Sequence, residues 1–395
     1  MKFHPIFHGF IRRLYYGRIT VTGGEHVPTS GPLLVLCLHR NGAVDGFVYR
    51  AAVPRLTFLV RAKLRKSVLG KLFFSGVEVV RSEDGGSPAD NLAMIDTCVR
   101  HLQSDEPLAI FPEGTSKLGP RHLPFKSGAA RIALSHLETG RPLTVLPLGI
   151  HYECPWAFRS RVEVVVGEAI RLEGSGLPAS RGARLRELKE RFTTALEAVG
   201  SNAPDARTFD LAQELAYIAT LGTGRRYFEA LKSMEQSLPA KAVQAWKRRE
   251  IVTWDKLVLR HQGVPLFPMG PAWLYVLLAL LLAVPVLGGA LLNLPPLAVG
   301  YFSARRFADD TNVIALWRIL TGVPCFVLWA AACVLTATLF GHGWLALGYL
   351  GLTWIAVRGW YRLKKLTVAA SNGLIHSDLR DEALALRRTL LTELP

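Results

Sequence analysis

The chain has 395 residues, of which 50% are hydrophobic, and it carries a formal net charge of +16 at pH 7. A chain that is both so apolar and so basic is unusual for a soluble enzyme. The combination indicates membrane-embedded segments beside a basic surface that faces anionic lipid or phosphate groups. Nucleic acid is the competing partner, but no zinc-finger spacing and no basic stripe interleaved with aromatic residues occurs, so we expect no nucleic-acid partner.

Residues 1–17 are predicted to form an amphipathic helix, because apolar residues recur at helical spacing. One face holds Phe3, Phe7, Phe10 and Leu14, and Lys2, Arg12 and Arg13 add positive charge. Such a helix can lie in a membrane interface, or it can pack on the domain that follows. Both roles stay open at this point, and we expect no cleavable signal peptide.

Residues 18–178 alternate strand-like runs with helical patterns, which predicts an α/β domain with a sheet covered by helices. The strand-like runs are Ile19–Thr22, Pro32–Leu38, Leu56–Val60, Val77–Arg81, Leu108–Phe111, Leu143–Ile150 and Val162–Val166. Asn91–Gln103 and Gly128–Leu137 have helical patterns. The runs Leu33–Leu38 and Leu143–Leu148 are almost wholly apolar, so we expect both faces of these strands to be buried.

Residues 179–262 are predicted to form a helical linker region that is rich in charge. Helical patterns cover Arg184–Ala198, Phe209–Leu221 and Lys232–Arg260. The last of these contains the basic run Lys247–Arg249. That run is either a solvated helix face or a contact with acidic lipid headgroups.

Residues 263–362 are predicted to form a membrane region. No Asp, Glu, Lys or Arg occurs from His261 to Ala304 or from Ile319 to Val357. Each stretch is longer than the roughly 20 residues that one spanning helix needs. Each also holds helix breakers, so we expect two hairpins of short or re-entrant segments rather than one long buried helix per stretch. The breakers are Pro285, Gly288–Gly289 and Asn293–Pro296 in the first stretch, and Gly341–Gly343 in the second.

Basic clusters flank both uncharged stretches, at Arg260, Arg305–Arg306 and Arg358–Lys365. Two hairpins would bring all these clusters to one side of the membrane, and the positive-inside rule makes that side cytoplasmic. We therefore expect an integral membrane protein, in a bacterial inner membrane, whose α/β domain is cytoplasmic. Residues 363–395 are predicted to form a C-terminal tail helix that is capped at Ser377–Asp378.

A first polar cluster follows the strand that ends near Leu38, where open α/β sheets place their chemistry. His39 and Asp45 lie on one turn there. A histidine is the natural general base near neutral pH, and a nearby carboxylate can fix its tautomer. No G-x-S-x-G nucleophile elbow occurs in the chain, so the pair suits direct activation of a substrate hydroxyl. Taken alone, a histidine and an aspartate six residues apart are a weak signal.

A second polar cluster, Phe111–Ser116, follows another apolar strand. Gly114 lets the backbone approach a ligand closely, and the hydroxyls of Thr115 and Ser116 with free backbone N–H groups can hold an anion. The competing interpretation is a tight turn after a strand, with Glu113 exposed to solvent.

Two basic residues can add to an anion site. Lys126 precedes a predicted helix, and a lysine beside a helix N-terminus can bind phosphate, although a surface lysine is the commoner case. Arg81 ends a predicted strand and can hold a phosphate through two hydrogen bonds. The chain shows no zinc-like spacing of His and Cys, and its five cysteines form no C-x-x-C pair. We therefore expect no metal, no cofactor and reduced cysteines.

Four sequence blocks together resemble the glycerolipid acyltransferases, that is, the glycerol-3-phosphate and lysophosphatidic acid acyltransferases. The blocks are His39–Asp45, Gly76–Arg81, Phe111–Ser116 and Val145–Leu148, and they stand in the order and approximate spacing of that family. Phe125–Ala129 is also typical of it. The family pattern has four residues between the histidine and the aspartate, whereas this chain has five. With Asn41, the longer spacing resembles the fungal-type glycerol-3-phosphate/dihydroxyacetone-phosphate branch and its bacterial relatives.

The resemblance implies a membrane-bound acyltransferase that needs no cofactor. His39, oriented by Asp45, would take the proton from a hydroxyl of a glycerol-phosphate acceptor, which then attacks the thioester of acyl-CoA or of an acyl-carrier protein. The acceptor would be glycerol-3-phosphate or 1-acylglycerol-3-phosphate. The residues expected to bind it are Arg81, Glu113, Gly114, Thr115, Ser116 and Lys126. Two alternatives stay open: another lysolipid acceptor, such as a lysophospholipid or lyso-ornithine lipid, and a non-catalytic lipid-binding membrane protein.

Overall fold

The computed structural model describes residues 3–80, 87–220, 223, 225–239, 243–244, 260–261, 264–265, 270–375 and 377–393. The chain divides into two compact units, which we call the sheet unit and the helical unit. The sheet unit consists of Met1–Ala157, Arg161–Gly200 and Ser303–Leu320, and the helical unit of Phe158–Ser160, Ser201–Phe302 and Thr321–Pro395. Residues 303–320, which lie inside the predicted membrane region 263–362, thus fold with the sheet.

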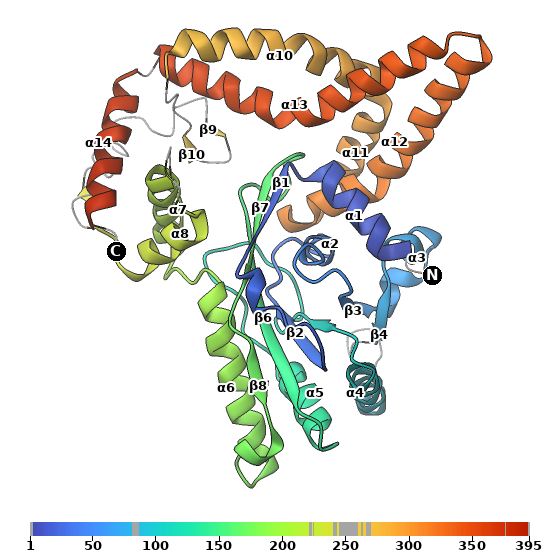
Figure 1. Cartoon of the computed structure of the whole chain (residues 1–395), viewed down its shortest axis with the longest axis vertical. Helices are drawn as coiled ribbons and strands as arrows, with labels where there is room; N and C mark the ends of the chain where they lie inside the picture. The colour runs from blue at the N-terminus through green and yellow to red at the C-terminus, as the bar shows by residue number, and fades with distance from the viewer. Residues whose placement is uncertain are drawn as a thin grey trace. The chain divides into compact units, whose positions relative to one another are not determined.

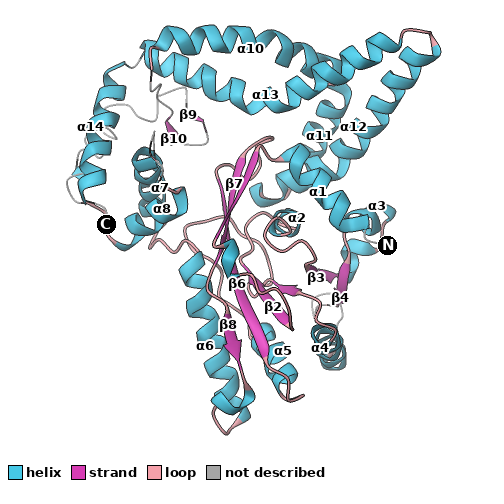
Figure 2. Ribbon diagram, viewed as in Figure 1, coloured by secondary structure: helices cyan, strands magenta, loops and turns pink. Residues whose placement is uncertain are grey.

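The sheet has eight strands in the order β1-β7-β6-β2-β5-β3-β4, with β8 paired to β6 (Figures 1 and 2). Strands β4, β3, β5, β2 and β6 run parallel, whereas β7 and β8 run antiparallel to β6 and β1 runs parallel to β7. The strands are β1 Arg18–Thr22, β2 Leu33–Cys37, β3 Thr57–Arg61, β4 Gly76–Val79, β5 Leu108–Ile110, β6 Leu143–Tyr152, β7 Arg161–Val166 and β8 Ile170–Leu172. The predicted α/β class is therefore confirmed.

Strand β2 lies at the centre of the sheet, between β5 and β6, and all five of its residues are buried. Helices cover a parallel sheet on both faces, so both faces of β2 are buried and its sequence is continuously apolar. The register pairs Leu36 with Ile110. Since paired parallel strands end at the same edge, the segments after Cys37 and Ile110 emerge side by side.

The α-helices in the described part of the sheet unit include α1 Phe3–Tyr15, α2 Val44–Tyr49, α3 Val68–Phe73, α4 Pro88–Gln103, α5 Gly128–Leu137 and α6 Arg181–Val199. A capping box starts α4, in which the hydroxyl of Ser87 accepts from Asp90 N and Ser87 N donates to the Asp90 carboxylate. Helix α5 has the predicted bounds, and it buries Ala129, Ile132 and Ala133. Helix α1 packs on α2 and α3.

The helical unit contains α7 Ala206–Thr220, α8 Tyr227–Gln236, α10 Ala272–Leu292, α13 Gly343–Ile375, α14 Ser377–Glu393 and the short pair β9 Arg260–His261 and β10 Val264–Pro265. Buried Leu215, Ile218, Met234 and Leu386 join α7, α8 and α14 in one core. The predicted helix Lys232–Arg260 is wrong in extent. Helix α8 ends at Gln236, since Pro239 disfavours helical backbone before it. The basic run Lys247–Arg249 lies outside the described residues.

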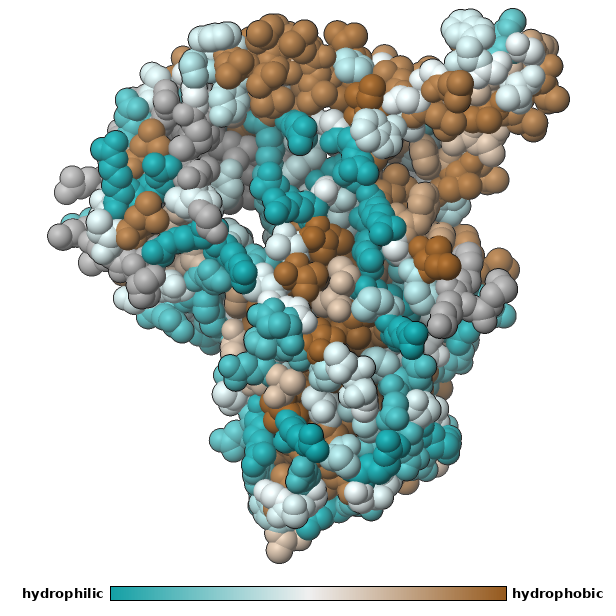
Figure 3. Space-filling model, in the orientation of Figure 1, coloured by the Kyte–Doolittle hydropathy of each residue, from teal (hydrophilic) through white to brown (hydrophobic). Residues whose placement is uncertain are grey.

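Helices α11 Leu294–Phe307 and α12 Ile314–Leu339 connect the two units in sequence. Ala272–Leu292 and Thr311–Leu339 are long and apolar enough to cross a membrane. Hydrophobic side chains gather over α10 and α12 in Figure 3. In the first uncharged stretch, helix α10 ends before Asn293. In the second, helix α12 ends at Leu339.

The residues Pro285, Gly288 and Gly289, which the sequence suggested as breakers, lie inside the continuous helix α10. Gly289 serves a packing contact instead. A Cβ built there would lie 2.6 Å from Ala356 Cβ and 2.7 Å from Leu352 O, both on α13. The glycine therefore lets α10 and α13 approach closely, in the way that small residues do between membrane helices.

Candidate active site

His39 stands two residues after β2, and Asp45 lies in the first turn of α2. The Nδ1 atom of His39 lies 2.9 Å from Asp45 Oδ2. The Asp45 side chain is fully buried, whereas that of His39 is 14% exposed. A carboxylate only accepts hydrogen bonds, so this contact places the ring proton on Nδ1 and leaves Nε2 with a lone pair. Within the described part of the chain, His39 Nε2 makes no hydrogen bond.

Three further donors hold the Asp45 carboxylate. Oδ2 also accepts from Arg40 N at 2.7 Å and Asn41 N at 2.9 Å, and Oδ1 accepts from Tyr152 Oη at 2.6 Å. Together with the histidine, these groups compensate the cost of burying the negative charge. The Asp45 carboxylate is therefore held by three parts of the fold: Tyr152 on β6, the backbone of the turn after β2, and the His39 ring.

The five-residue spacer between His39 and Asp45 closes a well-formed turn. Gly42 adopts φ +56°, a left-handed conformation that favours glycine, and Asp45 N donates to Gly42 O at 3.2 Å. Buried Asn41 donates from its amide to Tyr16 Oη at 3.2 Å and to Pro155 O at 2.8 Å. The longer spacing thus still brings His39 and Asp45 together, and Asn41 ties the turn to the segment after β6.

Two tyrosines, buried Tyr16 and half-buried Tyr152, lie near the Asp45 carboxylate, and their rings are in contact. Burial, and next the Asp45 carboxylate, raises the pKa of Tyr152 well above its usual range. Burial and then Tyr15 and Asp45 raise the pKa of Tyr16 in the same way. Both phenols therefore keep their protons, and Tyr152 remains a donor to Asp45.

Glu113 is 2% exposed and uses both carboxylate oxygens on backbone groups. Oε1 accepts from His39 N at 2.7 Å and Oε2 from Leu123 N at 2.8 Å. It therefore ties the histidine backbone to the loop that leads into α5. Its predicted contact with substrate stays a prediction.

Gly114 and Lys126 meet in the loop after β5. Gly114 has φ +75°, and a Cβ built there would lie 2.8 Å from Lys126 Nζ. Lys126 N donates to Pro112 O at 2.8 Å. The lysine side chain thus lies directly over the glycine backbone, as a joint anion site requires.

The remaining predicted residues differ in their placement. Thr115 is exposed and Ser116 is half-buried. Lys117 N donates to His39 O at 3.1 Å, so Ser116 lies beside the histidine backbone. Arg81 lies outside the described residues.

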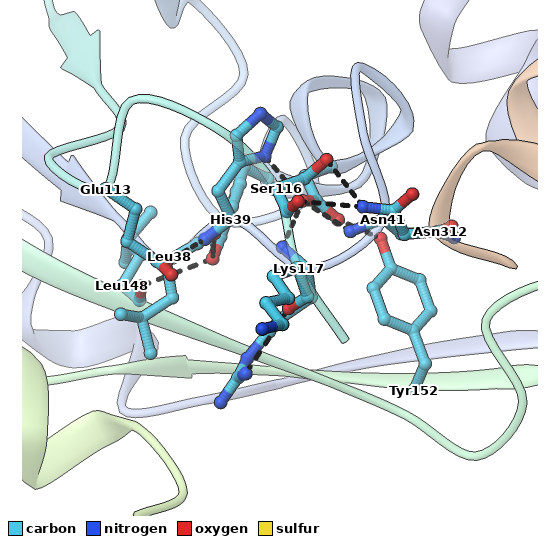
Figure 4. A network of polar contacts seen from close by, with 12 residues as sticks. Leu38, His39, Asn41, Glu113, Ser116, Lys117, Leu148, Tyr152 and Asn312 are labelled. Carbon is cyan, nitrogen blue, oxygen red and sulfur yellow. Dashed lines mark hydrogen bonds and ion pairs between the residues drawn. The ribbon is translucent and has the colours of Figure 1, made fainter. Parts of the chain in front are cut away.

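Three residues of the site were not among the predicted site residues, although Phe111 opens the Phe111–Ser116 block. Phe111 stacks under the His39 ring, with centroids 4.1 Å apart and planes at 21°. Tyr152 holds Asp45, as described above. Asn312 donates its amide to Ser116 O at 2.8 Å and Ser116 Oγ at 2.9 Å (Figure 4). Only the fold brings these residues to His39, because they lie 72 to 273 positions further along the chain. Among the described residues, no group of three or more His, Cys, Asp or Glu side chains could hold a metal ion.

Comparisons with known proteins agree with this geometry. The acyltransferase family model matches residues 18–151, which hold the turn after β2 and the loop after β5. This stretch, which holds most of the candidate site, is therefore similar to an acyltransferase domain.

Among its relatives, glycerol-3-phosphate O-acyltransferase 2 of Saccharomyces cerevisiae is 30% identical over 42% of this chain and 22% of the yeast protein. Glycerol-3-phosphate O-acyltransferase 1 of the same yeast is 29% identical over 54% of this chain and 40% of its own length. The chain thus spans well under half of either enzyme. The 1-acyl-sn-glycerophosphate acyltransferase PlsC from Thermotoga maritima matches at 19% identity and TM-score 0.34, over 50% of this chain and 77% of its own.

Proposed function

We propose that the protein transfers a fatty acyl group from a thioester donor to the hydroxyl of a glycerol-phosphate acceptor at a membrane. One observation carries this proposal: Asp45 holds His39 Nδ1 at 2.9 Å, and Nε2 has no partner among the described residues. This is the arrangement of a general base that acts on a substrate hydroxyl. The yeast relatives, named as glycerol-3-phosphate O-acyltransferases, support the choice of acceptor.

In the proposed reaction, His39 Nε2 takes the proton of the acceptor hydroxyl while the oxygen attacks the thioester carbonyl. The Asp45 carboxylate stabilises the imidazolium that forms. The C–S bond then breaks, and the imidazolium returns its proton to the departing thiolate. The products are an ester and a free thiol, so the proton balance closes without a cofactor.

The acceptor phosphate would lie against the loop after β5. In that loop Lys126 Nζ lies over the Gly114 backbone, and Lys117, the residue after Ser116, donates from its backbone to His39 O. A lysine charge and a hydroxyl can together bind a phosphate. Thr115 and Arg81 stay predicted contributors from the sequence, and acyl-CoA and an acyl-carrier protein are the two candidate donors.

A membrane setting is supported by two separate observations. The first is the pair of helices long and apolar enough to span a bilayer. The second lies on the sheet unit, where exposed apolar residues of α1 and α3 stand among basic ones. The apolar residues are Ile6, Phe10, Val68 and Leu69, and the basic ones are Arg13, Lys66 and Lys71. Such a surface fits an anionic lipid interface. A cytoplasmic position of the domain remains a prediction from the positive-inside rule.

An acceptor panel tests this function. Purified protein would receive radiolabelled acyl-CoA or acyl-carrier protein together with glycerol-3-phosphate, 1-acylglycerol-3-phosphate, a lysophospholipid or lyso-ornithine lipid. We expect label in the product of a glycerol-phosphate acceptor. Transfer only to the other lysolipids would replace the proposed acceptor. No transfer from either donor would favour a lipid-binding protein instead.

A further inference from the structure

Asn312 lies in the short segment between α11 and α12, within the sheet unit. Asn312 is 4% exposed, and among the described residues its amide donates only to Ser116, at the carbonyl oxygen and at Oγ. Its own backbone oxygen lies against Gly42, since a Cβ built on Gly42 would be 3.3 Å from it. The segment between α11 and α12 therefore contacts both polar loops of the candidate site.

The amide of Asn312 decides what the Ser116 hydroxyl can do. A serine hydroxyl has one proton and two lone pairs. Because Nδ2 of Asn312 is a donor, Ser116 Oγ must accept this bond, and its proton is directed elsewhere. Ser116 is half-buried, and its Oγ finds no acceptor among the described residues. The hydroxyl is thus held as a donor for an atom from outside the protein.

We propose that Asn312 is a positioning residue of the acceptor site, which fixes the Ser116 hydroxyl as a hydrogen-bond donor to the phosphate of the acyl acceptor. The inference rests on the proposed function, which supplies an acceptor that carries a phosphate. An ionised phosphate oxygen only accepts hydrogen bonds, so it suits a hydroxyl that is held as a donor. A carboxylate at position 312 would reverse the arrangement. It would accept the Ser116 proton itself and would repel the phosphate.

The test compares Asn312→Asp and Asn312→Ala with the wild-type full chain. The control is Asp309→Asn, which changes an exposed residue of the same segment. We expect Asn312→Asp to raise the KM for glycerol-3-phosphate about 10-fold or more, and Asn312→Ala to raise it by less. The KM for acyl-CoA and kcat should stay within about 2-fold of wild type, because neither variant touches His39. The control should match the wild type throughout.

A double-mutant comparison separates this role from a purely structural one. In a Ser116→Ala background, Asn312→Ala should add little to the acceptor KM, since the hydroxyl that it orients is gone. With an uncharged acceptor such as a 1-acylglycerol, the effect of Asn312→Asp should disappear. If Asn312→Asp does not fold, Asn312→Ala carries the same comparison.

The possible failures are distinguishable. A wild-type protein that acylates no phosphate-bearing acceptor overturns the proposed function, and the inference with it. An active wild type whose Asn312 variants keep the acceptor KM overturns the inference alone. So would KM increases that are equal for charged and uncharged acceptors, or that add fully to the Ser116→Ala effect.

Discussion

At the scale of residues, a buried carboxylate controls one ring nitrogen of a histidine and thereby frees the other. Asp45 accepts four hydrogen bonds, from His39, Arg40, Asn41 and Tyr152. Every one of these partners is a donor, so the site requires an acceptor-only group at this position. That requirement explains why an aspartate, rather than an amide of the same shape, stands at position 45.

The variant Asp45→Asn tests that requirement. An asparagine has one oxygen for four donors, so its NH2 group would face at least one donor, and Nδ1 of His39 would lose its fixed proton. We expect kcat to fall at least ~100-fold, the low end for a lost general base. The measurement is initial acyl-transfer rate at saturating substrates, with exposed Asp96→Asn on α4 as the control. Wild-type kcat in Asp45→Asn would show that the carboxylate does not orient the base.

The sequence indicated His39 and Asp45 because both stand on one turn after an apolar strand. It could not show that Glu113 binds two backbone N–H groups. Its partners, His39 N and Leu123 N, are backbone groups that nearly every residue type carries. Tyr152 and Asn312 were missed for a related reason. Their contacts depend on how distant segments fold together, and no local pattern records that.

At the scale of elements, α1 packs on the domain, as one of the two roles that its sequence left open requires, and it keeps exposed apolar residues. Its buried side holds Ile11 and His8, while Ile6 is 75% exposed and Phe10 is 44% exposed. His8 Nε2 lies 2.7 Å from Phe73 O on α3, and the His8 ring is tilted against Phe47 of α2, with centroids 4.3 Å apart. One face thus packs on the domain and another stays available to a membrane interface.

The packing of α1 should be sensitive to acid. Burial, and next Arg50, lowers the pKa of His8 from 6.5 to about 3. The unfolded chain therefore binds more protons than the folded one between these values, and stability falls as pH decreases from about 6.5 toward 3. Glutamine does not titrate. We therefore expect the thermal unfolding midpoint to decrease less between pH 7 and pH 5 in His8→Gln than in the wild type. Exposed His342→Gln is the control, and identical slopes in all three proteins would contradict the prediction.

The strands were largely predictable, because β2 and β6 are continuous apolar runs bounded by polar turns. The sequence missed β8, whose three residues are too few to show a period, and the six-residue helix α3 for the same reason. It misjudged Gly288–Gly289, since a glycine that permits helix contact and a glycine that ends a helix look alike in sequence.

At the scale of the whole molecule, two long apolar helices occur in one chain with a stretch that matches the acyltransferase family model. The sequence predicted an apolar region with breaks, and the structure has helix ends at Asn293 and Leu339. That Ser303–Leu320 belongs to the sheet unit was not foreseen, because its neighbours are uncharged helices and its own composition is ordinary.

Cysteine labelling tests whether α12 crosses the bilayer. Its uncharged part, from Ile319 to Leu339, holds about 20 residues, which is enough for one span. In a protein whose Cys325 and Cys333 are replaced by Ala, we expect a membrane-impermeant reagent to reach His342→Cys and Asp309→Cys from opposite sides. Both positions are exposed on the protein. Labelling of both from one side would mean a re-entrant hairpin.

The most direct measurement is the acyl-transfer rate of His39→Ala with glycerol-3-phosphate as acceptor. We expect kcat to fall at least ~100-fold relative to wild type, because no other described residue stands ready to take the hydroxyl proton beside Asp45. His342→Ala, a change of an exposed histidine, should leave kcat unchanged. Near-normal turnover by a folded His39→Ala would contradict the assignment of His39 as the general base.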